Sequence, residues 1–278
     1  MTWTLVEPCC GTGALTLAAL GATRPLMPHP HSQWTSTSYL LDLAREHGFH
    51  GPPSAVHVTD IGPWGSVLPV LLRPETRRDV LTCLKTFLAR EPRALFDALQ
   101  RRPVASQPSI AAAEFLTLQR LTTGHEAVEI RHGTWHSPSF SPEKAYGVRS
   151  PPLSVAASPR LPDLIAALET WDRLHPTVVH GERGTAPEPR PVSGSTLVAI
   201  DPPARTSEAY MAGHLMRGSV VELALGWDDA GATVFVTETE PIDDLVERGW
   251  RGVQLPDTGQ RTVDGMPIDA WVTISPRW

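Results

Sequence analysis

Two short segments, far apart in the chain, carry residues that could do chemistry at one site. The later segment is Asp201-Pro202-Pro203, which follows the apolar run 197–200. The prolines fix the backbone, and Pro202 lacks an N–H group, so a carbonyl near this turn can point outward as an acceptor. With the Asp201 carboxylate, it could accept both hydrogens of an aromatic amine and direct the nitrogen lone pair towards an incoming methyl group. Such chemistry depends on positioning more than on a strong base. The alternative is a strand that simply ends in a proline turn.

The earlier segment follows the apolar residues 3–6 and reads Glu7-Pro8-Cys9-Cys10-Gly11-Thr12-Gly13. Its glycines allow a sharp turn and a close approach of the backbone to a ligand. Amides of this turn, and of the helix expected after it, would suit a carboxylate or a polar nucleoside. Asp60 ends a second strand pattern, where a carboxylate can take both ribose hydroxyls. The alternative is a tight strand–helix turn, and the incomplete G-x-G-x-x-G spacing argues against a dinucleotide site.

The cysteines and histidines favour no further chemistry. Pro8-Cys9 could supply a thiolate nucleophile, but it lies inside the glycine turn, so we favour small packing residues. The eleven histidines form no spacing typical of metal ligands, and the sequence predicts no metal site.

The rest of the chain must position these residues, and its pattern is that of alternating strands and helices. A mainly parallel sheet follows from this alternation. Between residues 122 and 159 the periodicity is lost, which predicts a loop-rich recognition surface. Further loops are predicted at 24–31 and 182–194. Strands are predicted at 3–7, 55–60, 177–180, 196–200, 232–237 and near 270–275. Helices are predicted at 14–20, 38–47, 75–88, 92–99, 110–121, 161–174, 207–225 and 242–248.

Composition excludes several classes of protein. The 278 residues can bury a sizeable core, and no apolar run approaches the ~20 residues of a membrane span. The N-terminus shows no secretory signal and the three cysteines form no disulfide framework, so we expect a cytoplasmic protein without a membrane partner. The net charge is −6, yet arginines concentrate in residues 70–102, so a polyanion would meet the middle of the chain.

In this order the motifs resemble those of the DNA adenine methylase family, S-adenosylmethionine-dependent enzymes that methylate the adenine amino group in DNA. The catalytic turn resembles the family's Asp-Pro-Pro-Tyr, and the glycine turn resembles its Glu-Pro-Phe-x-Gly-x-Gly-Ala. The other similar segments are 60–63, 112–120 with Gly124, 133–138 and 234–241.

This resemblance implies a Rossmann-like methyltransferase fold of the α/β class, with a catalytic core over 1–69 and 160–278 and a helical target-recognition insertion over 70–159. It implies S-adenosyl-L-methionine as the cofactor and double-stranded DNA as the partner. It assigns catalysis to Asp201, Pro202 and Pro203. It assigns cofactor binding to Glu7, Pro8, Gly11, Gly13, Asp60 and Ile61. It assigns contact with DNA to Arg120, Gly124, Arg131, Trp135, Ala204 and Tyr210.

The chain departs from the family at three places. Ala204 replaces the aromatic residue that packs on the flipped-out base, unless Tyr210 or Trp34 substitutes for it. No Gly-Gly-Lys segment occurs, and Thr123-Gly124 stands where the family has Asn-Gly. Two alternatives therefore stay open. One is an amino-methyltransferase for cytosine, a modified base or RNA, and the other is a degenerate homologue that binds cofactor or DNA without turnover.

Overall fold

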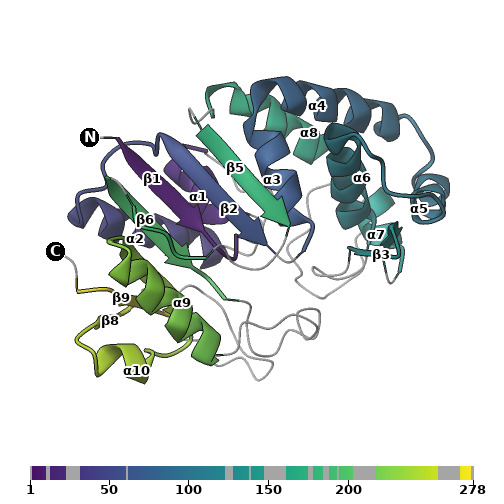
Figure 1. Cartoon of the computed structure of the whole chain (residues 1–278). Helices are drawn as coiled ribbons and strands as arrows, with labels where there is room; N and C mark the ends of the chain where they lie inside the picture. Colours follow the sequence, from purple (N-terminus) through teal and green to yellow (C-terminus); the bar gives the residue numbers. More distant parts are fainter. Residues whose placement is uncertain are drawn as a thin grey trace.

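The centre of the molecule, in the computed structural model, is a mixed sheet of seven strands (Figure 1). These are β1 (Trp3–Glu7), β2 (Ala55–Asp60), β5 (Val178–Arg183), β6 (Ser195–Ile200), β7 (Thr233–Glu238), β8 (Arg251–Gln254) and β9 (Trp271–Ile274). The structure describes residues 2–10, 13–22, 32–60, 62–122, 128–137, 139–146, 161–174, 178–183, 188–192, 194–202, 217–255 and 270–276.

The strand order is β5-β2-β1-β6-β7-β9-β8. The first five strands are parallel, while β9 runs antiparallel to both of its neighbours, β7 and β8. From β1 the chain moves outward to β2 and β5, then returns to the other side of β1 with β6 and moves outward again to β7. The direction reverses between β1 and β6, and open α/β sheets bind ligands outside the carboxyl ends of the strands at such a point. The predicted α/β class with a mainly parallel sheet is confirmed.

Helices cover both faces of the sheet. On one face, Leu5 of β1 and its register partner Leu197 of β6 pack with residues of α1 (Ala14–Ala19) and α2 (Ser32–Glu46). On the other, Val6 and Val198 pack with residues of α9 (Arg217–Asp229) and α10 (Asp243–Val246). This division follows from the alternation of side chains along a strand.

A further group of helices extends from the β5 side of the sheet, at the right of Figure 1. α3 (Trp64–Leu72) packs on β2 and β5 and also on α6 (Pro108–Leu121). One hydrophobic core runs from β2 through α3 into the surrounding helices. The boundary expected between residues 69 and 70 falls inside α3. The other elements of this group are α4 (Pro74–Leu88), α5 (Pro92–Gln100), the hairpin β3 (Glu129–Arg131) and β4 (Thr134–His136), α7 (Pro142–Tyr146), α8 (Leu161–Glu169) and the 3₁₀ helix Thr170–Arg173.

Most predicted elements lie where the pattern placed them, and the differences have physical reasons. α2 begins six residues before the predicted start, at Ser32. α3 was not predicted, because eight of its nine residues are buried and it therefore has no polar face to give a helical period. The predicted loop at 24–31 and the start of the helix predicted at 207–225 lie outside the described residues. The described helix continues four residues further than predicted, to Asp229.

No helix in the ranges that the structure describes combines the length and apolar character needed to cross a bilayer.

The contact between α3 and β5 depends on a glycine. Replacing Gly181 by alanine would place a Cβ 2.0 Å from Cγ of Pro69 and 2.9 Å from the carbonyl oxygen of Gly65. We expect Gly181→Ala to lower the free energy of unfolding by about 1–3 kcal/mol, measured in urea, because overpacking displaces the helix. Gly218→Ala in α9 is the matched control, since no atom lies within 4 Å of its added Cβ. Parent-like stability of Gly181→Ala would contradict this packing.

The rings of His57 and His180 lie side by side on β2 and β5, with centroids 4.8 Å apart. Burial, and then the neighbouring His180, lower the pKa of His57 below its ordinary value of 6.5. The unfolded chain therefore binds a proton more readily, so stability is lost as pH falls below about 6.5. We expect His57→Gln to show a shallower loss of unfolding free energy between pH 7 and 5 than the parent. A slope as steep as the parent's would show that another group is responsible.

Candidate functional site

The sheet brings three predicted carboxylates to one edge. Glu7 is the last residue of β1, Asp60 is the last of β2, and Asp201 directly follows β6. Because these strands are adjacent and parallel, their carboxyl ends meet beside the point where the strand order reverses. The negative charges of all three raise the pKa of Cys9, so all three lie near this side chain. The sequence predicted this gathering of Glu7, Asp60 and Asp201.

Glu7 ties the first turn to the helix that follows it. It is buried, and its Oε2 accepts hydrogen bonds from the backbone N–H of Thr16, at 3.0 Å, and from the Thr16 hydroxyl. That amide lies in the first turn of α1, where backbone donors lack helical partners. The pKa of Glu7 is raised to about 7, mainly by burial and also by the charge of Asp201, although the hydrogen bonds from Thr16 lower it. The carboxylate thus has a structural task beside any contact with a ligand.

The glycine turn is held by backbone contacts. The N–H of Cys10 donates to the carbonyl of Thr59 at 3.0 Å, and the N–H of Gly13 donates to the carbonyl of Cys10 at 2.7 Å. Gly13 has φ +69°, and a Cβ there would lie 2.2 Å from Cδ2 of Leu68 in α3. Only glycine satisfies both demands at this position. Pro8 is buried at the start of the turn, and Gly11 lies outside the described residues.

Asp60 stands where a ribose-binding carboxylate was predicted. Its side chain is buried, and Oδ1 accepts a hydrogen bond of 2.7 Å from the N–H of Gly62. The bond fixes the orientation of the carboxylate at the end of β2. Ile61, which lies between the two residues, is outside the described residues.

Asp201 is held by a residue that the sequence did not single out. The register pairs Ile200 with Val236, so Asp201 and Thr237 come side by side, and the Thr237 hydroxyl donates to Asp201 Oδ1. Desolvation raises the pKa of Asp201, whereas the hydrogen bond from Thr237 lowers it. Pro202 is half-buried, and Pro203 lies outside the described residues. The sequence signal for this contact was the position of Thr237, a hydroxyl residue directly after the buried run 234–236.

The cysteines are not activated. Burial and the neighbouring carboxylates raise the pKa of Cys9 to about 12, and burial raises that of Cys10 well above its ordinary value. Because the thiolate is the nucleophilic form, these thiols are unsuited to attack at neutral pH. Cys10 packs in the core, as the sequence favoured. Among the described residues, no group of three or more His, Cys, Asp and Glu is placed to hold a metal ion.

The residues assigned to DNA contact do not share one surface. Arg131 is exposed on β3 and forms an ion pair with Glu129. Arg120 is only 1% exposed, and Trp135 only 3%. The expectation that these two side chains lie at a DNA-facing surface is wrong for this arrangement, because the helical group buries both. Gly124, Ala204 and Tyr210 lie outside the described residues.

Trp135 packs in the hydrophobic core of the helical group, and a carboxylate there accepts a hydrogen bond from its indole N–H. Its Nε1 donates to Oε2 of Glu114 at 2.7 Å, and the same carboxylate accepts from the Arg102 guanidinium and from the N–H of Ala105. Glu114 thereby joins α6, the segment before it and the hairpin β3–β4. No such role was predicted for Glu114, although a carboxylate within the apolar run 112–118 is a signal of this kind.

In a comparison with known proteins, no protein-family model and no curated protein matches the chain.

The hydrogen bond from Thr237 leads to a testable prediction about the pKa of Asp201. A donor stabilises the ionised carboxylate, so we expect Thr237→Val to raise the pKa of Asp201 relative to the parent. The carboxyl carbon of Asp201 can be followed by NMR through a pH titration. Thr237→Ser, which keeps the hydroxyl, should restore the parent pKa. An unchanged or lowered pKa in Thr237→Val would refute the bond's role.

Proposed function

We propose that this protein is an S-adenosylmethionine-dependent methyltransferase that acts on the exocyclic amino group of adenine in DNA. The observation that carries the proposal is the position of Asp201. It directly follows β6, beside the reversal of strand order, on the same sheet edge as the glycine turn and Asp60. Sheets of this kind use that edge for nucleoside ligands.

The fold supports the same conclusion at a coarser level. Five parallel strands in the order β5-β2-β1-β6-β7, with helices on both faces, are compatible with a Rossmann-like methyltransferase fold. The turn around Gly13 would lie along the cofactor, and the Asp60 carboxylate would accept the ribose hydroxyls. Bound S-adenosylmethionine supplies an electrophilic methyl group on a sulfonium cation. A region flanked by Glu7, Asp60 and Asp201 suits that positive charge.

Residues of the chain would orient the amine, take its proton and bind DNA. Asp201 accepts a hydrogen of the target amine and orients its lone pair, and Thr237 holds the carboxylate in place. After methyl transfer the nitrogen carries an extra proton, which the Asp201 carboxylate can take. Positioning of this kind is sensitive to displacements of about 1 Å, which can cost about a hundredfold in rate. Exposed arginines of the helical group, such as Arg78, Arg101 and Arg131, would contact phosphates and set the orientation of DNA.

One observation favours a second candidate, a homologue that binds cofactor or DNA without turnover. Burial of Arg120 and Trp135 removes two of the assigned DNA contacts. Ala204 also lacks the ring that would stack on a flipped base, an interaction that contributes about 1–3 kcal/mol.

The test separates cofactor binding from chemistry. Calorimetry should first show that S-adenosylmethionine and its demethylated product bind, and that Asp60→Ala weakens both. Transfer of a radiolabelled methyl group to double-stranded DNA should then fall about a hundredfold or more in Asp201→Asn, because the neutral amide lacks the negative charge of the carboxylate and cannot take the proton from the amine. Asp244→Asn, an exposed acid on α10, is the matched control and should keep parent activity.

Equal methylation by the parent and Asp201→Asn would remove the catalytic role of Asp201. Cofactor binding without transfer to DNA, RNA or free bases would favour the non-catalytic homologue. Absence of cofactor binding by the folded protein, with and without DNA, would overturn the proposal as a whole.

A further inference from the structure

Two histidines that are far apart in the chain meet on one face of the sheet. His57 lies in the middle of β2 and His180 in the middle of β5, and the parallel register makes them direct partners. Their rings lie side by side, with centroids 4.8 Å apart and planes inclined by 32°. Because the pairing of two strands brings them together, the spacing of histidines along the chain, which predicted no metal site, could not indicate this pair.

The histidine pair is accessible from solvent. Val58 and Val179 share a hydrophobic core with α3, so α3 covers the face of β2 and β5 to which these two valines point. Side chains alternate along a strand, and the two histidines therefore point to the opposite face. On that face α9 packs over β6 and β7, towards the other end of the sheet (Figure 1). His57 is half-buried and His180 is exposed, so a small ion can reach both rings.

The ring nitrogens are available as ligands. Within the described part of the chain, neither ring takes part in a hydrogen bond or an ion pair. A neutral imidazole offers a nitrogen lone pair and is the commonest metal ligand in proteins. Copper, nickel and zinc ions all accept such ligands.

The separation of the rings fits two imidazoles on one metal ion. A zinc-bound imidazole nitrogen lies about 2.0–2.1 Å from the ion, which places the ring centroid ~3.2 Å from it. Two rings that subtend about 90–110° at the ion then have centroids about 4.5–5.2 Å apart. The observed 4.8 Å falls within this range. Rotation of the two side chains is enough to turn one nitrogen of each ring towards a shared ion, and exposed side chains rotate rapidly.

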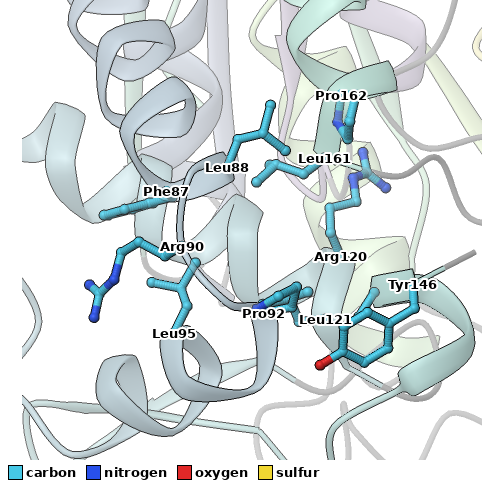
Figure 2. A pocket seen from close by; sticks show the side chains of 11 residues that line it. Phe87, Leu88, Arg90, Pro92, Leu95, Arg120, Leu121, Tyr146, Leu161 and Pro162 are labelled. Carbon is cyan, nitrogen blue, oxygen red and sulfur yellow. The ribbon is translucent and has the colours of Figure 1, made fainter.

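The pocket in the helical group is of a different kind (Figure 2). It has a volume of about 150 Å³ and a mostly apolar wall, with Phe87, Leu95 and Leu161 among its residues. The described residues that line it include no His, Cys, Asp or Glu. It therefore offers none of the usual ligands of a transition metal.

We propose that His57 and His180 together bind one divalent transition-metal ion that prefers imidazole ligands, such as Zn²⁺ or Cu²⁺. The protein supplies two ring nitrogens, and a four-coordinate ion keeps two positions open for water or another ligand. The bound ion would join β5, which lies at the edge of the sheet, to β2. This inference does not depend on the chemistry at the carboxyl edge of the sheet.

Zn²⁺ alone is a suitable probe, because it is diamagnetic and the histidine ring signals can be followed by NMR. The signals of His57 and His180 should shift together with a single midpoint. The chain has eleven histidines, so the signals are assigned from single variants. The exposed His50, outside the pair, should not follow the same midpoint, and the methyl signals of Leu95 in the pocket should not move. Mg²⁺, which prefers oxygen ligands, should leave both rings unchanged.

Variants test whether the two rings hold the same ion. Loss of a partner of a metal ligand already costs about 10–100-fold in metal affinity, so His57→Gln and His180→Gln should each weaken Zn²⁺ binding about tenfold or more. The loss in the double variant should be smaller than the product of the two single losses, because both rings act on one ion. His180→Phe keeps a ring beside His57 but no ligand, and should lose binding as His180→Gln does. His50→Gln is the matched control and should bind as the parent does.

Several outcomes would overturn the proposal. They are the absence of a shift of either ring in excess Zn²⁺, different midpoints for the two rings, and parent-like binding by either single variant. Single losses that multiply in the double variant would also overturn it, since they would show two independent sites. Circular dichroism of each variant checks that the fold is intact.

Discussion

The parallel pairing of β1 with β2 on one side and β6 on the other is the constraint on which the candidate site depends. Leu5 pairs with Val56 and with Leu197, and all three side chains are almost completely buried. Helices cover both faces, so a shift of either neighbour by one residue would exchange the apolar side chains that fit the helices of one face with those that fit the helices of the other. The pattern of apolar side chains on the two faces therefore fixes the register. The register in turn fixes which residues stand at the carboxyl edge.

The predictable part of the structure is the part governed by this pattern. β1 and β2 were predicted at their observed bounds, because short apolar runs there end in Glu7 and Asp60. Glu7, Asp60 and Asp201 were assigned to one site, and their meeting depends on parallel strands and also on the places of β2 and β6 on the two sides of β1. Thr237 was not predicted as a partner of Asp201, since that contact depends on which strand lies next to β6, and the sequence does not state the order of strands.

In the helical group the bounds of α4, α5 and α6 were predicted to within two residues, but the burial of α6 on more than one face was not predicted. Every residue of α6 from Ala112 to Leu121 is buried, so that the helix lies inside the group and has no surface stripe. An arginine at the end of such a helix resembles a surface residue in the sequence, yet Arg120 is enclosed by neighbours that are distant in the chain. The same holds for Trp135, which packs in the hydrophobic core and donates a hydrogen bond to Glu114.

The ionisation of Glu7 links the sheet edge to the stability of the whole molecule. Its carboxyl group ionises at about pH 7 in the fold and near 4.5 in the unfolded chain. The folded state therefore binds the proton more tightly, and Glu7 makes folding progressively less favourable as pH rises from about 4.5 through 7. Over the same interval the edge that holds Asp201 gains a negative charge. A rise in pH therefore lowers the free energy of unfolding while it adds a negative charge that can attract a cation to the sheet edge. The pH of the surroundings sets the balance between the two effects.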